Sequence, residues 1–207
     1  MKWLYYFIKR LCDIVIGLIG CILLIPVSLG VKLANMLNGD FGPLIFANKR
    51  IGKNGKVIKI YKFRSMCVNA EQMLEDLMKN SPKIREEYLT NHKLDPDPRV
   101  TKVGKFIRKT SIDELPQFIN VLLGNMSVVG PRPYLPREKE DMGEAYDSII
   151  KCKPGITGPW QVGGRNDTDF ESRTKMEAEY KNKRSFLLDT KIFFKTIKVV
   201  LFGRGAK

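Results

Sequence analysis

The stretch KFIRKTSIDELPQFINVLLGNMSVVGPRP, residues 105–133, decides how the rest of the sequence is interpreted. It holds two adjacent carboxylates, Asp113 and Glu114, with basic side chains before them. Apolar residues with helical spacing follow Pro116 and stop at Gly124, which predicts a helix that begins at Pro116. The carboxylates then lie beside the positive end of a helix dipole, which favours an ionised Asp113. An ionised carboxylate among cations suits nucleophilic attack on a phosphate ester.

A second interpretation of the same residues is purely structural. Ser111 and Glu114 have the S-x-x-E spacing of a capping box, in which the acids merely begin a helix. In that register Pro116 falls at the fifth helical position, where its ring strains the first turn. The spacing alone leaves both interpretations open.

The composition points to a polyanionic partner. Of 207 residues, 36 are Lys or Arg and 22 are Asp or Glu, which gives a formal net charge of +14. Such an excess fits nucleic acid, an anionic membrane surface or phosphorylated substrates. Cys12, Cys21, Cys67 and Cys152 show no C-x-x-C spacing, so we expect reduced thiols in a cytosol-facing protein, without a zinc site or disulfides.

The N-terminal part is typical of a membrane helix. Residues 1–10 are basic and aromatic, and residues 14–31 carry no charge, close to the minimum for a bilayer span. Positive charges return at Lys32, so both flanks favour the cytoplasm. Pro26 removes one backbone hydrogen bond and favours a bend, and Ser28 could satisfy a freed carbonyl. We therefore prefer a re-entrant helix over a full span, with a buried core helix as the third alternative.

The remaining segments predict further elements. Residues 38–56 are turn-rich and read as a loop, and residues 57–66 alternate apolar and basic side chains as a strand does. Three basic residues of that strand, Lys59, Lys62 and Arg64, would share one face if the alternation holds. The other predicted segments are an amphipathic helix at 69–80, a polar segment at 81–99 that ends in an extended turn at DPDPR, an acidic helix or loop at 138–148, a glycine-rich turn at 153–166 suited to cradling phosphate, a charged helix at 170–184 and a helix at 186–202. In the last helix Lys191, Lys195 and Lys198 form one cationic edge, which fits either a membrane interface or ordinary packing.

Several long motifs occur in the order seen in one protein family. They are GPLIFANKRIGKNGK, YKFRSM, DPRVTKVGKFIRKTSIDELPQ, NMSVVGPRP and KPGITGPWQVGGRN. Over nearly its whole length the chain resembles bacterial sugar transferases of the small monotopic phosphoglycosyl transferase family. The resemblance implies transfer of a sugar phosphate from a nucleoside diphosphate sugar, usually a UDP-sugar, to polyprenol (undecaprenyl) phosphate, with release of UMP.

The same resemblance implies roles for individual residues. Asp113 would be the nucleophile that forms a covalent phosphosugar intermediate, and Glu114 would complete the dyad as an acid–base group or metal neighbour. Mg²⁺ would lie on both carboxylates. The residues that would bind substrate phosphates are Arg108 and, less directly implied, Lys62, Arg64, Arg132 and Arg165.

Pattern and resemblance together predict a mainly helical α+β chain. We expect a re-entrant membrane-anchoring helix over residues 1–36 and one catalytic domain over residues 37–207, on the cytosolic face of the bacterial cytoplasmic membrane. The domain should contain a small β-hairpin or sheet and amphipathic interfacial helices, and the resemblance implies the minimal catalytic form of the family. Ile25 departs from some small members, which have serine before the proline.

Two other functions fit parts of the sequence. A membrane-tethered basic module without catalysis would use the net charge to bind nucleic acid or acidic lipid. Its basic residues are not interleaved with aromatic ones as base stacking requires, so no nucleic-acid partner is expected. The pairs Asp95/Asp97 and Asp167/Asp169 have the D-x-D spacing of metal-dependent glycosyltransferases, which release UDP, but the spacing is common. The sugar (galactose, glucose or an N-acetylated hexosamine), the glycan pathway and a homo-oligomeric state stay open.

Overall fold

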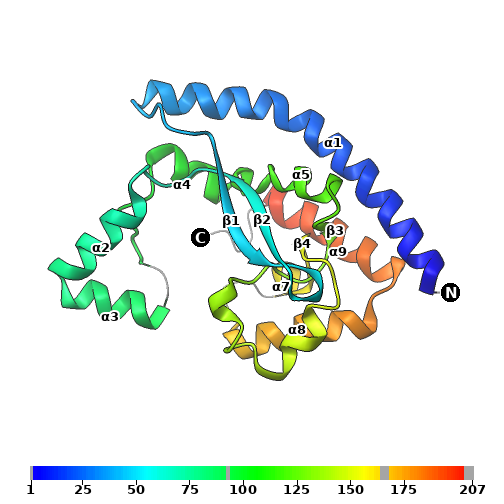
Figure 1. Ribbon diagram of the computed structural model, residues 1–207. Helices are drawn as coiled ribbons and strands as arrows, with labels where there is room; N and C mark the ends of the chain where they lie inside the picture. Colours follow the sequence, from blue (N-terminus) through cyan, green and yellow to red (C-terminus); the bar gives the residue numbers. More distant parts are fainter. Residues whose placement is uncertain (1, 92–93, 164–167, 203–207) are drawn as a thin grey trace.

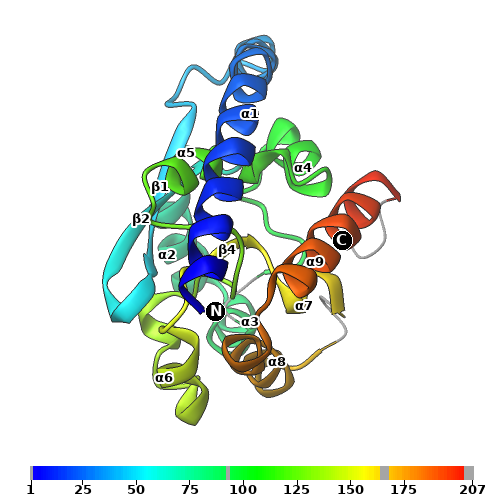
Figure 2. The ribbon, with the colours of Figure 1, turned by 90° about the vertical axis from the view of Figure 1, so that its right-hand side faces the viewer.

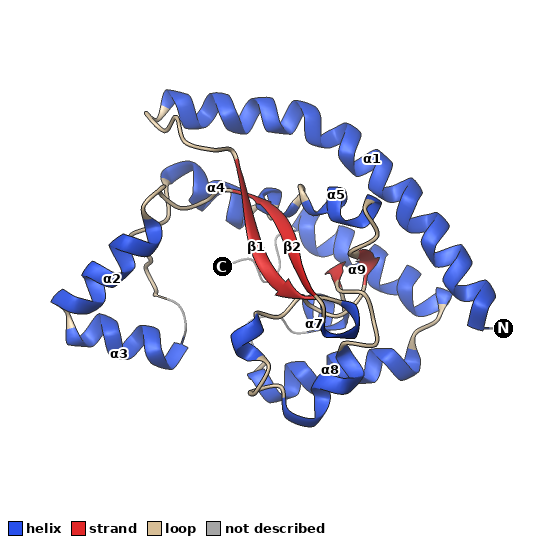
Figure 3. Cartoon of the chain, viewed as in Figure 1, coloured by secondary structure: helices blue, strands red, loops and turns tan. Residues whose placement is uncertain are grey.

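The computed structural model describes residues 2–91, 94–163 and 168–202, and this part of the chain is mainly helical (Figure 3). The helices are α1 Lys2–Leu37, α2 Ala70–Asn80, α3 Pro82–Asn91, α4 Lys102–Lys109, α5 Gln117–Leu122, α6 Tyr146–Ile149, α7 Pro159–Gly163, α8 Phe170–Lys183 and α9 Phe186–Phe202. The strands are β1 Ile45–Ile51, β2 Val57–Phe63, β3 Ser127–Val129 and β4 Gly155–Thr157. The predicted mixture of helices with small sheets is confirmed.

Helix α1 arches over one side of the molecule (Figures 1 and 2). It contains 36 residues and continues through Pro26, so the chain bends as one helix and does not break into two at the proline. At about 1.5 Å per residue it is roughly 54 Å long. By length and composition, residues Trp3–Leu37 could cross a membrane.

Polar contacts fasten α1 to the rest of the chain near both of its ends. The Lys9 ammonium lies 2.6 Å from an Asp189 carboxylate oxygen of α9. One turn further, buried Asp13 accepts a hydrogen bond from the Val128 amide of β3 at 2.9 Å. Near the other end, the Lys32 ammonium donates to a backbone carbonyl before β1 at 3.3 Å. The helix is therefore held along its length by the same folded body.

Close apolar packing joins α1 to α5 and to the core. A side chain at Gly20 would collide with the Phe118 ring, so glycine permits this close approach. Leu24 and Val31 of α1 form one buried cluster with Phe63 of β2 and with α4. The opposite face of α1 carries exposed large apolar residues: Leu4, Phe7, Leu11, Ile14, Val15, Leu18, Ile19, Ile22, Leu23, Ile25, Leu29 and Leu33. That face is left without a protein partner among the described residues.

Strands β1 and β2 form an antiparallel hairpin below α1 (Figure 1). The strand prediction for residues 57–66 is confirmed for Val57–Phe63, but the interpretation of residues 38–56 as loop is wrong for β1. The register pairs Phe46 with Lys62 and Arg50 with Ile58. Because residues two apart share a face, Lys62 and Arg50 project from the same face of the hairpin.

Helices α2 and α3 form an arm that projects away from the body (Figure 1). The predicted helix at 69–80 is confirmed as α2, with Leu74 buried. The polar segment 81–99 contains a helix that was not predicted, α3, whose first residue is Pro82. Proline is well suited to that position because its fixed φ matches a helix start and its missing N–H is not needed there.

The glycine-rich segment 153–166 begins with β4, which pairs in parallel with β3. A side chain on Gly155 or Gly158 would collide with the Gly130 backbone. These two glycines therefore serve close packing between backbones, and the expected phosphate cradle is not formed by them. Residues 164–167 of the segment lie outside the described residues.

The two C-terminal helices are confirmed as α8 and α9. Ile192 of α9 is buried in the same cluster as β2 and β3, whereas Phe194 is exposed and Lys191 and Lys195 face outward. A place for α9 in the membrane interface remains a prediction.

Glu177 of α8 is fully buried beneath the loop that follows β3. One of its carboxylate oxygens accepts a hydrogen bond from the Arg132 backbone amide. Burial raises the pKa of Glu177 to about 8, although that hydrogen bond and the charges of Arg132 and Arg173 act in the opposite direction. The side chain is therefore protonated in the folded protein at neutral pH.

Replacing Glu177 with Gln should remove a loss of stability that develops as the pH rises from about 4.5 to about 8. The unfolded chain releases this proton near pH 4.5 and the folded chain near pH 8, so wild-type stability falls as pH rises between these values and is constant above them. At about 1.4 kcal/mol per pKa unit the fall is on the order of several kcal/mol. Thermal unfolding from about pH 5 to about pH 9 measures it. Glu179→Gln, at an exposed position of α8, should keep the wild-type profile, and a wild-type profile for E177Q would contradict the assignment.

Candidate active site

Asp113 and Glu114 lie in a short 3-10 turn, Ile112–Glu114, between α4 and α5. Helix α5 begins at Gln117, one residue later than predicted, so the carboxylates precede the helix by a separate turn. Ser111 adopts a left-handed backbone conformation with φ of 58°, and its side chain makes no capping hydrogen bond. The capping-box interpretation is therefore wrong, and the acids are not there to begin α5.

Lys62 of β2 reaches both carboxylates. Its ammonium lies 2.6 Å from Glu114 Oε1 and 3.6 Å from Asp113 Oδ2. Asp113 is buried, with its side chain 13% exposed, whereas 37% of the Glu114 side chain is exposed. One cation thus joins the hairpin to the turn and holds the two acids side by side.

The charge state of Asp113 is set by opposing influences. Burial raises its pKa above the ordinary value, Lys62 lowers it, the neighbouring Glu114 raises it, and Arg108 lowers it. In place of the expected helix dipole, Lys62 and Arg108 are the groups that favour the ionised form of Asp113. The cations of β2 and α4 stabilise the carboxylate against its own desolvation.

Helix α4 presents Arg108 to this site. Thr101 begins α4 by accepting a hydrogen bond from the Gly104 amide at 2.9 Å. Gly104 lies so close to the Ser65 carbonyl that a side chain would collide with it. This contact fixes α4 against the end of the hairpin, where Arg108 Nε donates to Ser65 Oγ at 2.8 Å. The rest of the Arg108 guanidinium stays accessible, because the residue is exposed.

Arg64 takes a different place from the one predicted. Its guanidinium binds both Asp40 carboxylate oxygens, at 2.7 and 3.0 Å, and donates to the Pro43 carbonyl at 2.6 Å. None of its hydrogen bonds goes to Asp113 or Glu114. Arg64 therefore fastens the segment between α1 and β1, and the structure does not bring it into the dyad.

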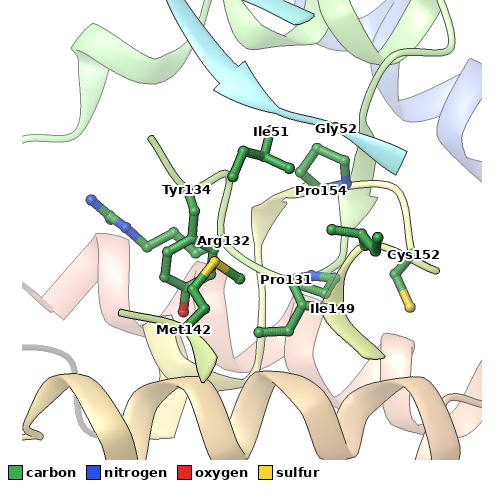
Figure 4. Close-up of a pocket in the computed structure, with 10 residues that line it drawn as sticks. Ile51, Gly52, Pro131, Arg132, Tyr134, Met142, Ile149, Cys152 and Pro154 are labelled. Atoms are coloured by element: carbon green, nitrogen blue, oxygen red, sulfur yellow. The ribbon is translucent and has the colours of Figure 1, made fainter. Parts of the chain in front are cut away.

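Arg132 lies in the loop after β3. Its guanidinium stacks over the Trp160 ring, 5.1 Å from the ring centroid. In Figure 4 its side chain runs away from the small cavity lined by Tyr134 and Met142. That cavity has a volume of about 10 Å³, enough for about one water molecule, so it is not a substrate pocket. Arg165 lies outside the described residues.

The D-x-D pairs have structural partners. Asp97 binds the Arg99 guanidinium at 2.7 and 2.9 Å. Asp169 begins α8 by accepting a hydrogen bond from the Ser172 amide at 2.6 Å, and Asp167 lies outside the described residues. Asp97 and Asp169 are thus used within the fold, which disfavours a D-x-D metal site, while Asp95 is exposed.

The dyad offers the ligands that Mg²⁺ takes in phosphoryl transfer. Such sites use one or two carboxylates, with water and substrate phosphates completing the octahedron. Asp113 and Glu114 supply two adjacent carboxylates, and no cluster of three or more His, Cys, Asp or Glu suited to a metal occurs in the part of the chain that the structure describes. The donor set fits a cation shared with substrate.

Arg50 is a site residue that sequence reasoning missed. It is half-buried, and its Nη1 donates to the Pro133 carbonyl at 3.3 Å. Burial, followed by the charge of Arg132, lowers the pKa of Arg50 to about 10, while Glu114 acts in the opposite direction. The residues IFANKRI do not alternate between apolar and polar side chains, and placing Arg50 with Lys62 requires the hairpin register.

Comparison with known proteins identifies the family of the chain. The family model described as "Bacterial sugar transferase" matches residues 4–203. The chain is 46% identical over 200 residues to an undecaprenyl-phosphate galactose phosphotransferase of Salmonella typhimurium, covering 97% of this chain and 42% of that protein. It is 40% identical over 198 residues to the exopolysaccharide production protein ExoY of Sinorhizobium fredii, covering 96% and 87%. It is 42% identical over 198 residues to a UDP-glucose:undecaprenyl-phosphate glucose-1-phosphate transferase of Escherichia coli, covering 92% and 39%.

The chain spans less than half the length of the Salmonella and Escherichia relatives. The match nevertheless includes every described element from α1 to α9, and with it the Asp113–Glu114 turn. The chain belongs to the bacterial sugar transferase family.

Proposed function

We propose that the chain transfers a sugar-1-phosphate from a UDP-sugar to polyprenol phosphate through a covalent intermediate on Asp113. The observation that carries the proposal is the buried Asp113 carboxylate held beside Glu114 by Lys62, with Arg108 close by. The names of the relatives supply the substrate class, an undecaprenyl phosphate and a nucleotide sugar. The resulting polyprenol diphosphate sugar begins the assembly of a glycan.

In the first step an Asp113 carboxylate oxygen attacks the phosphorus atom that carries the sugar. A bond forms between that oxygen and phosphorus, and the bond from phosphorus to the bridging oxygen breaks. The electron pair leaves with UMP. Lys62 and Arg108 bind the phosphate oxygens on which negative charge is concentrated, the main requirement in phosphoryl transfer. Mg²⁺, when bound to the dyad, supplies further neutralisation of phosphate charge.

In the second step a phosphate oxygen of the lipid attacks the same phosphorus atom. The bond to Asp113 breaks, and the carboxylate is restored for the next cycle. The covalent relay separates one difficult displacement into two and spares the enzyme from binding a soluble nucleotide and a membrane lipid together. Burial of Asp113 excludes competing water from the intermediate.

The packing of α1 supports one disposition relative to the membrane. Both ends of α1 bind the same folded body, through Lys9 and Lys32, while its other face is apolar and exposed. If α1 crossed the bilayer upright, polar groups such as the Asp13 carboxylate and its β3 partners would enter hydrocarbon. We therefore place α1 with its apolar face in one leaflet and both ends on the cytosolic side, which matches its positively charged flanks.

Asp113→Asn should abolish turnover while leaving the fold intact. An amide cannot form the phosphosugar bond, so UMP release from a UDP-sugar should fall by on the order of a thousandfold or more. Asp147→Asn, at an exposed position of α6, is the control and should keep wild-type turnover. Incubation with a UDP-sugar radiolabelled in the sugar, without lipid, should label wild-type protein and not D113N. Turnover by D113N would contradict the nucleophile assignment, and release of UDP would indicate direct glycosyl transfer.

Lys62→Met should weaken catalysis and move the acid limb of the pH–rate profile to higher pH. Lys62 lowers the pKa of Asp113, so without it burial keeps the carboxylate protonated to a higher pH and activity is lost earlier on acidification. A lost charged hydrogen bond corresponds to about ten- to a hundredfold in kcat/KM. Lys59→Met, at an exposed position of the same strand, should leave kcat/KM and the acid limb of the pH–rate profile unchanged. An unshifted limb in K62M would show that Lys62 does not control the ionisation of Asp113.

Single cysteines at Trp3 and Asn38 should be labelled from the same side of the membrane. Both positions are exposed, one near each end of α1. In a background with the four native cysteines replaced, a membrane-impermeant maleimide should label both in inverted inner-membrane vesicles and neither in right-side-out vesicles. Labelling of the two positions from opposite sides would mean that α1 crosses the bilayer.

A further inference from the structure

Arg50 is a half-buried cation without an acidic partner among the described residues. Its one hydrogen bond to a described residue is the 3.3 Å contact with the Pro133 carbonyl, and no described carboxylate lies within ion-pair distance of it. Arg64, in contrast, binds both oxygens of Asp40. A cation that is partly removed from water is stabilised by an anionic partner, so Arg50 has an unfilled capacity to bind an anion.

Two more arginines increase this positive charge. Arg132 and Arg137 both act on the ionisation of Arg50, and they destabilise its charged form. Glu138 and Glu114 oppose this effect, but Glu138 accepts the Leu135 amide and Glu114 binds Lys62. The loop after β3 and the end of β1 thus gather three cations, with Arg132 and Arg137 close enough to affect the ionisation of Arg50.

The hairpin determines where this cluster lies relative to α1. Arg50 and Lys62 project from the same face, and their positions are separated by four residues along the strands, roughly 13 Å. Phe63, next to Lys62, packs against α1, whereas Ile51, next to Arg50, packs against Tyr134 in a cluster without α1 residues. In Figure 1 the end of the hairpin where β1 finishes and β2 begins accordingly lies on the side away from α1. Lys62 therefore lies at the membrane end of the site and Arg50 at the opposite end.

We propose that Arg50, together with Arg132 and Arg137, binds the nucleotide-side phosphate of the donor and stabilises it as it leaves. This inference rests on the proposed function. When Asp113 bonds to the sugar-bearing phosphorus, the bridging bond breaks and its electron pair increases the negative charge of the departing nucleoside monophosphate. A guanidinium cluster at that position stabilises the leaving group more strongly than the bound donor. The lipid phosphate enters from the α1 side, where Arg50 does not reach.

Nucleotide binding by purified full-length variants in detergent tests the assignment. We expect Arg50→Gln to weaken the binding of UDP and of UMP by about ten- to a hundredfold, measured by calorimetry. In each nucleotide, the phosphate that Arg50 binds loses a charge-assisted hydrogen bond. Lys49→Gln is the matched control, since it removes the same charge from an exposed neighbour on the other face of β1, and it should bind UDP as wild type does. In turnover assays R50Q should raise the KM for the UDP-sugar and leave the KM for polyprenol phosphate unchanged.

Arg137→Gln provides a second variant that does not disturb the core, because Arg137 is exposed. It should weaken UDP binding in the same direction even if R50Q unfolds. Wild-type affinity for UDP in R137Q and in folded R50Q would overturn the inference, as would a raised KM for the lipid with unchanged UDP affinity. If wild-type protein binds no UDP and releases no UMP, the proposed function fails as well, so the two failures are distinguishable.

Discussion

The ion pair from Lys62 to Asp113 and Glu114 is the contact on which the site depends. It places one cation against two adjacent carboxylates that would otherwise repel each other, and it does so where Asp113 is largely removed from water. Without that charge, burial would favour the protonated form of Asp113 and the site would lose its nucleophile. Stability and reactivity are therefore linked through one side chain that comes from a different element than the acids.

The position of Lys62 is secured by the fold around it. Asn120 of α5 is completely buried, and its amide accepts from the Tyr61 backbone N–H and donates to the Lys59 carbonyl. These bonds attach the free edge of β2 to the helix that follows the dyad, at 3.0 and 2.7 Å. The strand bearing the cation and the turn bearing the acids consequently share one rigid support, as a preorganised site requires.

Local sequence patterns made much of this fold predictable. The elements and contacts that depend on long-range pairing could not be predicted in this way. The uncharged run of α1, the apolar spacing of α2 and α9, the charged segment of α8 and the alternation of β2 correspond to observed elements because each signal is local. β1 was missed because glycines and prolines flank it, and α3 because its segment is polar on most sides. In the site, adjacency of Asp113 and Glu114 was visible in the sequence. The separation of Lys62 from Arg64, one joined to the dyad and the other to Asp40, depends on tertiary contacts that no spacing encodes.

The packing of α1 has a consequence for where the chemistry occurs. Ile112 and Leu115, which flank the dyad, pack on the same buried cluster as Leu24 and Val31 of α1. One layer of side chains thus separates the nucleophile from the helix, and a helix is about 10 Å across. In the disposition that we propose, the height of the carboxylate above the hydrocarbon is fixed by this layer, with no hinge between anchor and catalyst. A lipid phosphate at headgroup level meets the carboxylate without leaving its leaflet, so the length of the polyprenol tail is irrelevant to the reach of the reaction.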